Sequence, residues 1–165
     1  MIRHMKYFSL TTLILLFSVV LIGCNADPKT FNSNDVDYLE YGGALPDELP
    51  FTGAVRAGNL VFLSGQIGNI PGKLELVEGG IEAESRQTMD NIKDLLQGNG
   101  MSMNDVVKCT VMLTDMKEWP AFNEIYRTYF EPPYPARSAL GANGLAIGAR
   151  VEVECIASAA PKTLR

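Results

Sequence analysis

The residues best suited to chemistry in this sequence are one arginine and two glutamates near its C-terminal end. Arg137 follows a proline-rich break, and Glu152 and Glu154 lie in an alternating Val-Glu-Val-Glu segment. Alternate residues of a strand share one face, so the two carboxylates are expected side by side. A guanidinium held at a sheet edge can bind a carboxylate through two parallel hydrogen bonds. This combination predicts a binding site for a small anionic substrate.

Each of these charges also has an ordinary structural interpretation. Arg137 could form a salt bridge with a neighbouring helix or subunit, because most arginines are not ligands. Glu152 could hold a water and accept its proton, a role that a pKa raised by burial would suit. It could equally lie on a solvated strand face, and Glu154 on the same face could be the base instead. The residues alone leave these alternatives open.

Histidine chemistry is excluded from most of the chain. The single histidine is His4, in an N-terminal segment that we expect to be removed. Without it, neither a Ser-His-Asp nor a Cys-His mechanism can operate, and no His-ligated metal site can form. Ser64 therefore has no base to activate it as a nucleophile. We expect no metal site.

The N-terminal segment is typical of an exported lipoprotein. A short basic start precedes an uncharged apolar run over residues 7–22, followed by Gly23 and Cys24. This pattern predicts a signal peptide over residues 1–23, a lipidated Cys24 within a tether over residues 24–36, and a folded domain over residues 37–165. The alternative is a membrane-spanning anchor, but the run is shorter than the ~20 residues that a bilayer requires. The expected location is the periplasmic face of the inner or outer membrane, or the cell surface, with the lipid on Cys24 as the membrane contact.

The charge of the domain argues against nucleic-acid binding. The whole chain carries a net charge of −5, and removal of residues 1–23 takes away Arg3 and Lys6 but no acid, which leaves −7. An acidic domain without basic runs does not attract phosphates. The remaining length suits a single domain.

Cys109 and Cys155 both fall in apolar alternating segments. Small buried side chains are the favoured interpretation. The two cysteines could form a disulfide in an oxidising compartment if their strands are neighbours.

The elements that position these residues follow from periodicity and from Gly and Pro breaks. The run at 60–63 is almost purely apolar, which predicts a strand buried on both faces. Strands separated by helices predict an α+β fold with one sheet and two helices on one face, and a half-polar second face that suits a subunit interface. The expected strands cover residues 37–41, 54–57, 60–63, 73–77, 106–113, 136–142 and 149–159, and the expected helices cover residues 81–97 and 114–130.

Several blocks, in order and spacing, resemble the Rid family, also called the YjgF or L-PSP endoribonuclease-like family. The likeness extends from about residue 50 to residue 159. The blocks that carry it are Ser64-Gly65-Gln66-Ile67, Arg86-Gln87-Thr88-Met89-Asp90-Asn91-Ile92, residues 107–115, residues 123–126 with Phe130, Pro135-Ala136-Arg137-Ser138, and Val151-Glu152-Val153-Glu154-Cys155-Ile156-Ala157.

The resemblance implies a fold and an activity. The fold is chorismate-mutase-like: a mixed sheet with two helices on one face, three copies of which form a barrel with sites in the clefts between subunits. Archetypal members hydrolyse enamines and imines of 2-amino acids to 2-keto acids and ammonia, without a metal or a cofactor. The resemblance therefore implies a homotrimer that acts on a small carboxylate.

The resemblance also assigns roles to residues. The arginine that binds the substrate carboxylate falls on Arg137, and the glutamate that holds the attacking water falls on Glu152. The site-lining serine and asparagine fall on Ser64 and Asn123. Phe51 stands where archetypes have a tyrosine. Ala139 replaces a cysteine, and the loop over residues 143–148 departs from the usual Leu-Pro pattern.

Three functions remain as hypotheses. The first is an exported deaminase of enamine and imine intermediates, with Arg137 and Glu152 as its central residues. The second is a non-catalytic module that binds small carboxylates, favoured by Phe51 and Ala139, which make the pocket less polar. The third is the endoribonuclease activity of the family's older name, against which the charge and the missing histidine argue.

Overall fold

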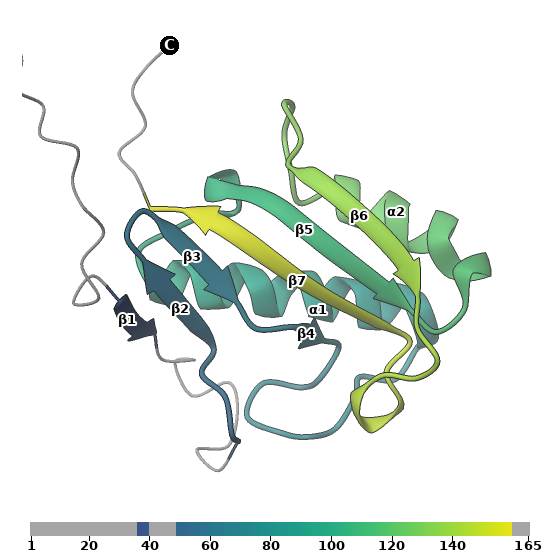
Figure 1. Cartoon of the computed structure of the whole chain (residues 1–165). Coiled ribbons are helices and arrows are strands. Elements are labelled where there is room, and N and C mark those ends of the chain that lie inside the picture. The colour runs from purple at the N-terminus through teal and green to yellow at the C-terminus, as the bar shows by residue number, and fades with distance from the viewer. Residues whose placement is uncertain (1–35, 40–48, 160–165) are drawn as a thin grey trace, which may run out of the picture. The chain divides into compact units, whose positions relative to one another are not determined.

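The structure is a computed structural model, which describes residues 36–39 and 49–159 (Figure 1). The predicted signal peptide and Cys24 lie outside these residues. The described part of the chain contains no helix long and apolar enough to cross a membrane.

A mixed sheet forms one layer of the domain. Its order is β1-β2-β3-β7-β5-β6, and the short β4 also pairs with β7. Neighbours are antiparallel except β5 and β6, which are parallel because the intervening chain crosses over through a helix. The strands are β1 (Val36–Leu39), β2 (Ala54–Ala57), β3 (Leu60–Leu63), β4 (Gln66–Ile67), β5 (Val106–Leu113), β6 (Ala136–Gly141) and β7 (Val151–Ser158).

Two helices, α1 (Gly80–Gly98) and α2 (Trp119–Arg127), cover one face of this sheet (Figure 1). Pro120 lies in the first turn of α2, where its missing N–H removes no helical hydrogen bond. We call the face under the helices the helical face and the other the open face. Single turns of 3₁₀ helix occur at Met103–Asp105, Met116–Glu118 and Ala146–Gly148.

The core lies between the helices and the sheet. In β7 the odd-numbered residues Val151, Val153, Cys155 and Ala157 are buried, whereas the even-numbered ones face the open side. Ile92, Leu96 and Phe122 close the core from the helices, and all three are fully buried. The predicted layer of one mixed sheet and two helices is confirmed.

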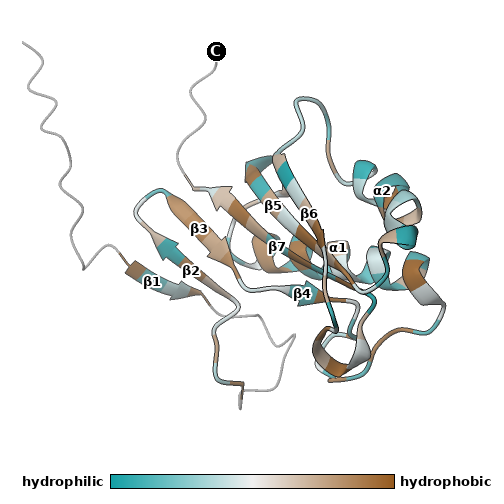
Figure 2. Cartoon of the chain, turned by 45° about the vertical axis from the view of Figure 1, so that its right-hand side comes forward, coloured by the Kyte–Doolittle hydropathy of each residue, from teal (hydrophilic) through white to brown (hydrophobic). Residues whose placement is uncertain are grey.

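Two sequence predictions about strands were wrong, and one strand was missed. The β2–β3 hairpin forms as expected, but Leu60 and Phe62 remain 42% and 44% exposed, since no helix covers the open face of β3 (Figure 2). Residues 73–77 form no strand and contribute only the bridge between Asn69 and Leu76. The short β4 was not predicted.

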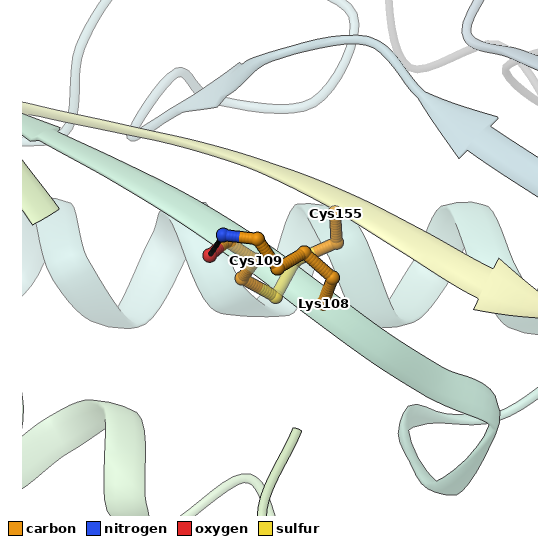
Figure 3. Close-up of a disulfide and its surroundings, with 3 residues drawn as sticks. All are labelled: Lys108, Cys109 and Cys155. Carbon is orange, nitrogen blue, oxygen red and sulfur yellow. Dashed lines mark hydrogen bonds between the residues drawn. A yellow bond between two sulfur atoms is a disulfide. The ribbon is translucent and has the colours of Figure 1, made fainter. Parts of the chain in front are cut away.

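Cys109 and Cys155 are buried, as expected, and they form a disulfide, which the sequence had left as the less favoured alternative. They lie opposite each other on β5 and β7, with Cα atoms 4.1 Å apart. Figure 3 shows the bridge between these strands, with α1 behind them. The pairing depends on strand order, which the spacing of 46 residues does not reveal.

Candidate active site

Arg137 lies on the helical face at the sheet edge. It is the second residue of β6 and lies opposite Cys109 of β5, whose side chain is in the core. Its Nη2 donates a hydrogen bond to Oδ1 of Asn123 on α2, over 2.9 Å. The structure thus brings together two of the predicted site residues.

Two aromatic rings hold the guanidinium of Arg137. Its Cζ lies 4.5 Å from the ring centroid of Trp119 and 4.5 Å from that of Tyr126. Within the described residues Arg137 forms no ion pair with a carboxylate. Because aromatic faces attract a cation without neutralising it, the charge remains available to a ligand. A salt bridge with a neighbouring helix was one alternative role for Arg137, and the described residues provide none.

The sequence analysis missed Trp119 and Tyr126 as neighbours of Arg137. A signal was present, because they lie four residues before and three residues after Asn123 and so share a face of α2. Burial raises the pKa of Tyr126 to about 12, although the nearby Arg137 acts in the opposite direction. Tyr126 is therefore a neutral phenol at physiological pH.

The Arg137 cleft has a volume of about 310 Å³. Its lining combines two guanidinium groups, an amide and two phenol rings, a set that can receive a planar anion. The lining residues are Asn123, Tyr126, Arg127, Tyr134, Pro135 and Arg137.

Glu152 lies on the open face, near the start of β7. It lies opposite Ile67 of β4 and Met112 of β5. Burial raises the pKa of its carboxyl above the ordinary value, and the negative charge of Glu154 raises it further. A carboxylate with a raised pKa is a stronger base, as proton abstraction from water requires.

Gly65 makes room for the Glu152 carboxylate. A Cβ atom on Gly65 would lie 2.0 Å from Oε1 of Glu152 and 2.9 Å from its Cδ. The backbone that follows β3 therefore packs directly against the acid, and only glycine leaves this space. The Ser-Gly-Gln block indicated a site-lining serine, but the reason for its glycine becomes visible only in the structure.

A second cleft, of about 470 Å³, contains Glu152, Ser64 and Phe51. The Ser64 hydroxyl donates to the carbonyl oxygen of Thr52 over 2.6 Å, so its proton is engaged and its lone pairs can still accept. The whole lining is Leu49, Phe51, Ser64, Gly65, Gln66, Ile67, Asn69, Leu74, Ala146, Ile147 and Glu152. We call this the Glu152 cleft.

Within one chain the predicted site residues fall into two groups. Arg137 and Asn123 line one cleft, and Phe51, Ser64 and Glu152 line the other. Strand register explains the division, because Arg137 lies opposite Cys109 on the helical face and Glu152 lies opposite Met112 on the open face. The sheet therefore separates the guanidinium from the carboxylate.

Ala139, which stands where the family has a cysteine, lies on β6, is exposed and carries no polar group. In the part of the chain that the structure describes, no three His, Cys, Asp or Glu side chains gather to hold a metal ion.

The fold and the two clefts define a small α+β protein with a charged site on each face of its sheet. Residues 43–159 match the sequence model of the family described as Endoribonuclease L-PSP. The chain therefore belongs to this family, which is the Rid family of the sequence resemblance.

Curated relatives and solved structures agree with this assignment. The 2-iminobutanoate/2-iminopropanoate deaminase of Mus musculus is 41% identical over 68% of this chain and 83% of its own. The crystal structure of RidA from an Antarctic Psychrobacter has a TM-score of 0.69 and 37% identity, over 74% of this chain and 98% of that one. E. coli TdcF with bound serine has a TM-score of 0.68 and 30% identity, over the same shares.

Proposed function

We propose that this chain is a hydrolase of the Rid family that deaminates enamine and imine intermediates of 2-amino acids. The class of enzyme follows from relatives that are named deaminases at about 40% identity. The observation that carries the proposal is Arg137, a guanidinium held by two rings and an amide with no acid to neutralise it. A substrate carboxylate is the natural partner of such a group.

The proposed reaction uses four side chains and one water molecule. Arg137 binds the carboxylate of the imino acid, and Glu152 accepts a proton from a water that adds to the carbon of the C=N bond. Glu152 passes this proton to the nitrogen, which gives a carbinolamine. Glu152 then takes the hydroxyl proton of the carbinolamine and delivers it to the amino group, which leaves as ammonia as the C=O bond forms. The products are a 2-keto acid and ammonia. Ser64 and Asn123 position the polar atoms around this centre.

The complete site requires two copies of the chain. Arg137 and Glu152 lie on opposite faces of one sheet, so a single substrate reaches both only where the Arg137 cleft of one copy meets the Glu152 cleft of another. Apolar residues on the open face, such as Phe62, support such packing. We place the site between the subunits of a homotrimer.

The test is keto-acid and ammonia release from an imino acid generated freshly in solution. Arg137→Ala is expected to lower kcat/KM by about 10- to 150-fold, because a charge-assisted hydrogen bond is worth ~1.5–3 kcal/mol. Arg86→Ala is the matched control, since Arg86 is an exposed arginine of α1 outside both clefts. Equal rates for the wild type and Arg137→Ala would refute the proposal.

A binding module for small carboxylates is the second candidate. Phe51 lines the Glu152 cleft without a hydroxyl, and Ala139 has no polar group. Calorimetry with 2-keto acids distinguishes the candidates. Binding without turnover of any imine supports the module, whereas absence of both binding and turnover excludes both the deaminase and the module.

We also propose that the protein is an exported lipoprotein attached through Cys24. The disulfide between Cys109 and Cys155 supports this location, because such bonds persist in oxidising compartments. Mass spectrometry of the N-terminal peptide tests it: a diacylglyceryl group on Cys24, absent from Cys24→Ala, is expected. An unmodified N-terminus in the membrane-free fraction would contradict it.

A further inference from the structure

The Glu152 cleft is much larger than a small imino acid needs. Its volume is about 470 Å³, and apolar side chains dominate its walls. Three of them are strongly exposed to the cleft and to solvent: Phe51 at 52%, Leu74 at 54% and Ile147 at 49%. A substrate with a single methyl group would contact only a small part of these apolar walls.

Ser64 and Glu152 are the polar side chains of this lining that are not buried, and Glu152 packs against Gly65. Gln66 and Asn69 are buried, and their amides donate to backbone carbonyls. The described lining contains no lysine or arginine. The substrate carboxylate therefore has no cation in this cleft and must point toward Arg137. The side chain of the substrate is then the part that remains to fill the apolar walls.

The backbone holds one of these apolar residues in place. Ile147 has φ 49° and ψ 20°, a left-handed conformation that is rare for a β-branched residue. A conformation that costs free energy persists where the surrounding structure fixes it, and such residues cluster at ligand sites. The turn Ala146–Gly148 thus presents Ile147 to the cleft.

We propose that the substrates are 2-imino acids with large apolar side chains, of the kind that arise by oxidation of leucine or phenylalanine. This inference rests on the proposed deaminase function. Leu74, Phe51 and Ile147 form the specificity-determining wall. Each methylene transferred from water to an apolar wall is worth about a fourfold change in affinity. Three additional carbons separate the leucine-derived imine from the alanine-derived one. We therefore expect kcat/KM to favour the leucine-derived substrate at least tenfold.

The experiment compares imines that an amino-acid oxidase generates in solution from alanine, leucine and phenylalanine. Keto-acid release above the spontaneous rate gives kcat/KM for each substrate, with the full-length protein and with two variants. Leu74→Ser is expected to lower the ratio of the leucine to the alanine value at least fivefold. Leu60→Ser should retain the ratio, because Leu60 is a comparably exposed leucine outside the cleft. Light scattering reports the molar mass of each variant.

Three results would overturn the inference, and they are distinguishable. Equal kcat/KM for all three imines would reject the preference but leave the deaminase function intact. Equal losses on all substrates in Leu74→Ser, together with a changed molar mass, would show that the wall serves subunit packing. Turnover of none of the imines would instead reject the proposed function itself.

Discussion

At the scale of single residues, the environment of Arg137 is the most informative feature. Trp119, Tyr126 and Asn123 orient its guanidinium, and none of them carries a charge. A carboxylate in their place would hold the arginine more strongly but would neutralise it. Neutral support therefore keeps the side chain both fixed and able to bind an anion.

The first prediction concerns Trp119. Trp119→Leu removes one of the two rings over the guanidinium, a contact worth ~0.5–1 kcal/mol, so KM should rise about two- to fivefold while kcat changes little. Trp119→Phe retains a ring and should remain close to the wild type. Steady-state kinetics on one imine substrate provide the measurement. An unchanged KM in Trp119→Leu would show that the ring does not hold Arg137.

The second prediction concerns the pKa of Glu152. Burial raises this pKa first, and the negative charge of Glu154 raises it further. Glu154→Gln removes the repulsion, so the pKa of Glu152 should fall and the acidic limb of the kcat/KM profile should move to lower pH. Thr110→Val, which changes a neutral residue opposite Glu154, is the control. A limb that moves to higher pH, or does not move, would contradict Glu152 as the base.

At the scale of elements, the start of β7 is held from two sides. Oε2 of Glu84, a buried residue of α1, accepts a hydrogen bond from the Arg150 backbone N–H over 2.8 Å. The Arg150 side chain pairs with Glu118, just before α2. These contacts fix the position from which Glu152 extends.

The third prediction tests the close approach between the chain after β3 and Glu152. In Gly65→Ala the new Cβ would overlap Oε1 of Glu152, so the carboxylate must move, and kcat should fall at least tenfold. The overlap involves the end of a flexible side chain, so the fold should survive. In Gly98→Ala the Cβ meets no atom within 4 Å, and activity should be retained. Circular dichroism checks that both variants fold, and steady-state kinetics measure kcat for each.

The fourth prediction concerns the disulfide between β5 and β7. Closing a loop of 46 residues stabilises the folded state by about 4 kcal/mol in the chain-entropy account. The double variant Cys109→Val with Cys155→Ala should therefore unfold at a lower urea concentration than the oxidised wild type. A reducing agent should destabilise the wild type and leave the double variant unchanged. If reduction has no effect on the wild type, the bond does not form in solution.

At the scale of the whole molecule, the division of the site between two faces of the sheet makes a direct prediction. Arg137→Ala and Glu152→Gln should each retain only a small fraction of the wild-type activity alone. When the two are unfolded together and refolded in equal amounts, some interfaces combine an intact Arg137 with an intact Glu152. If the two variants assemble at random into a cyclic oligomer, about a quarter of the interfaces combine both intact residues. Recovery of roughly a quarter of wild-type activity is therefore expected. A mixture no more active than the separately refolded variants would place the site within one chain.

Both helices, most of the strands and the chemistry of the candidate residues could be predicted from the amino-acid sequence. The periodicity of residues 81–97 predicts α1, and the alternation around Glu152 predicts β7, because both depend on contacts between near neighbours in the chain. Family motifs identified Arg137, Asn123, Ser64 and Glu152 as candidates. All four of these residues line one or the other of the two clefts.

How these residues are combined could be seen only once the strands were placed beside one another. The pairing of Cys109 with Cys155, the exposure of Leu60 and the separation of Arg137 from Glu152 all depend on strand order and register. A strand's own sequence shows which of its residues alternate, but not which strand lies beside it or which face a helix covers. Those choices come from long-range packing, and they turn a list of suitable side chains into two half-sites on opposite faces of one sheet.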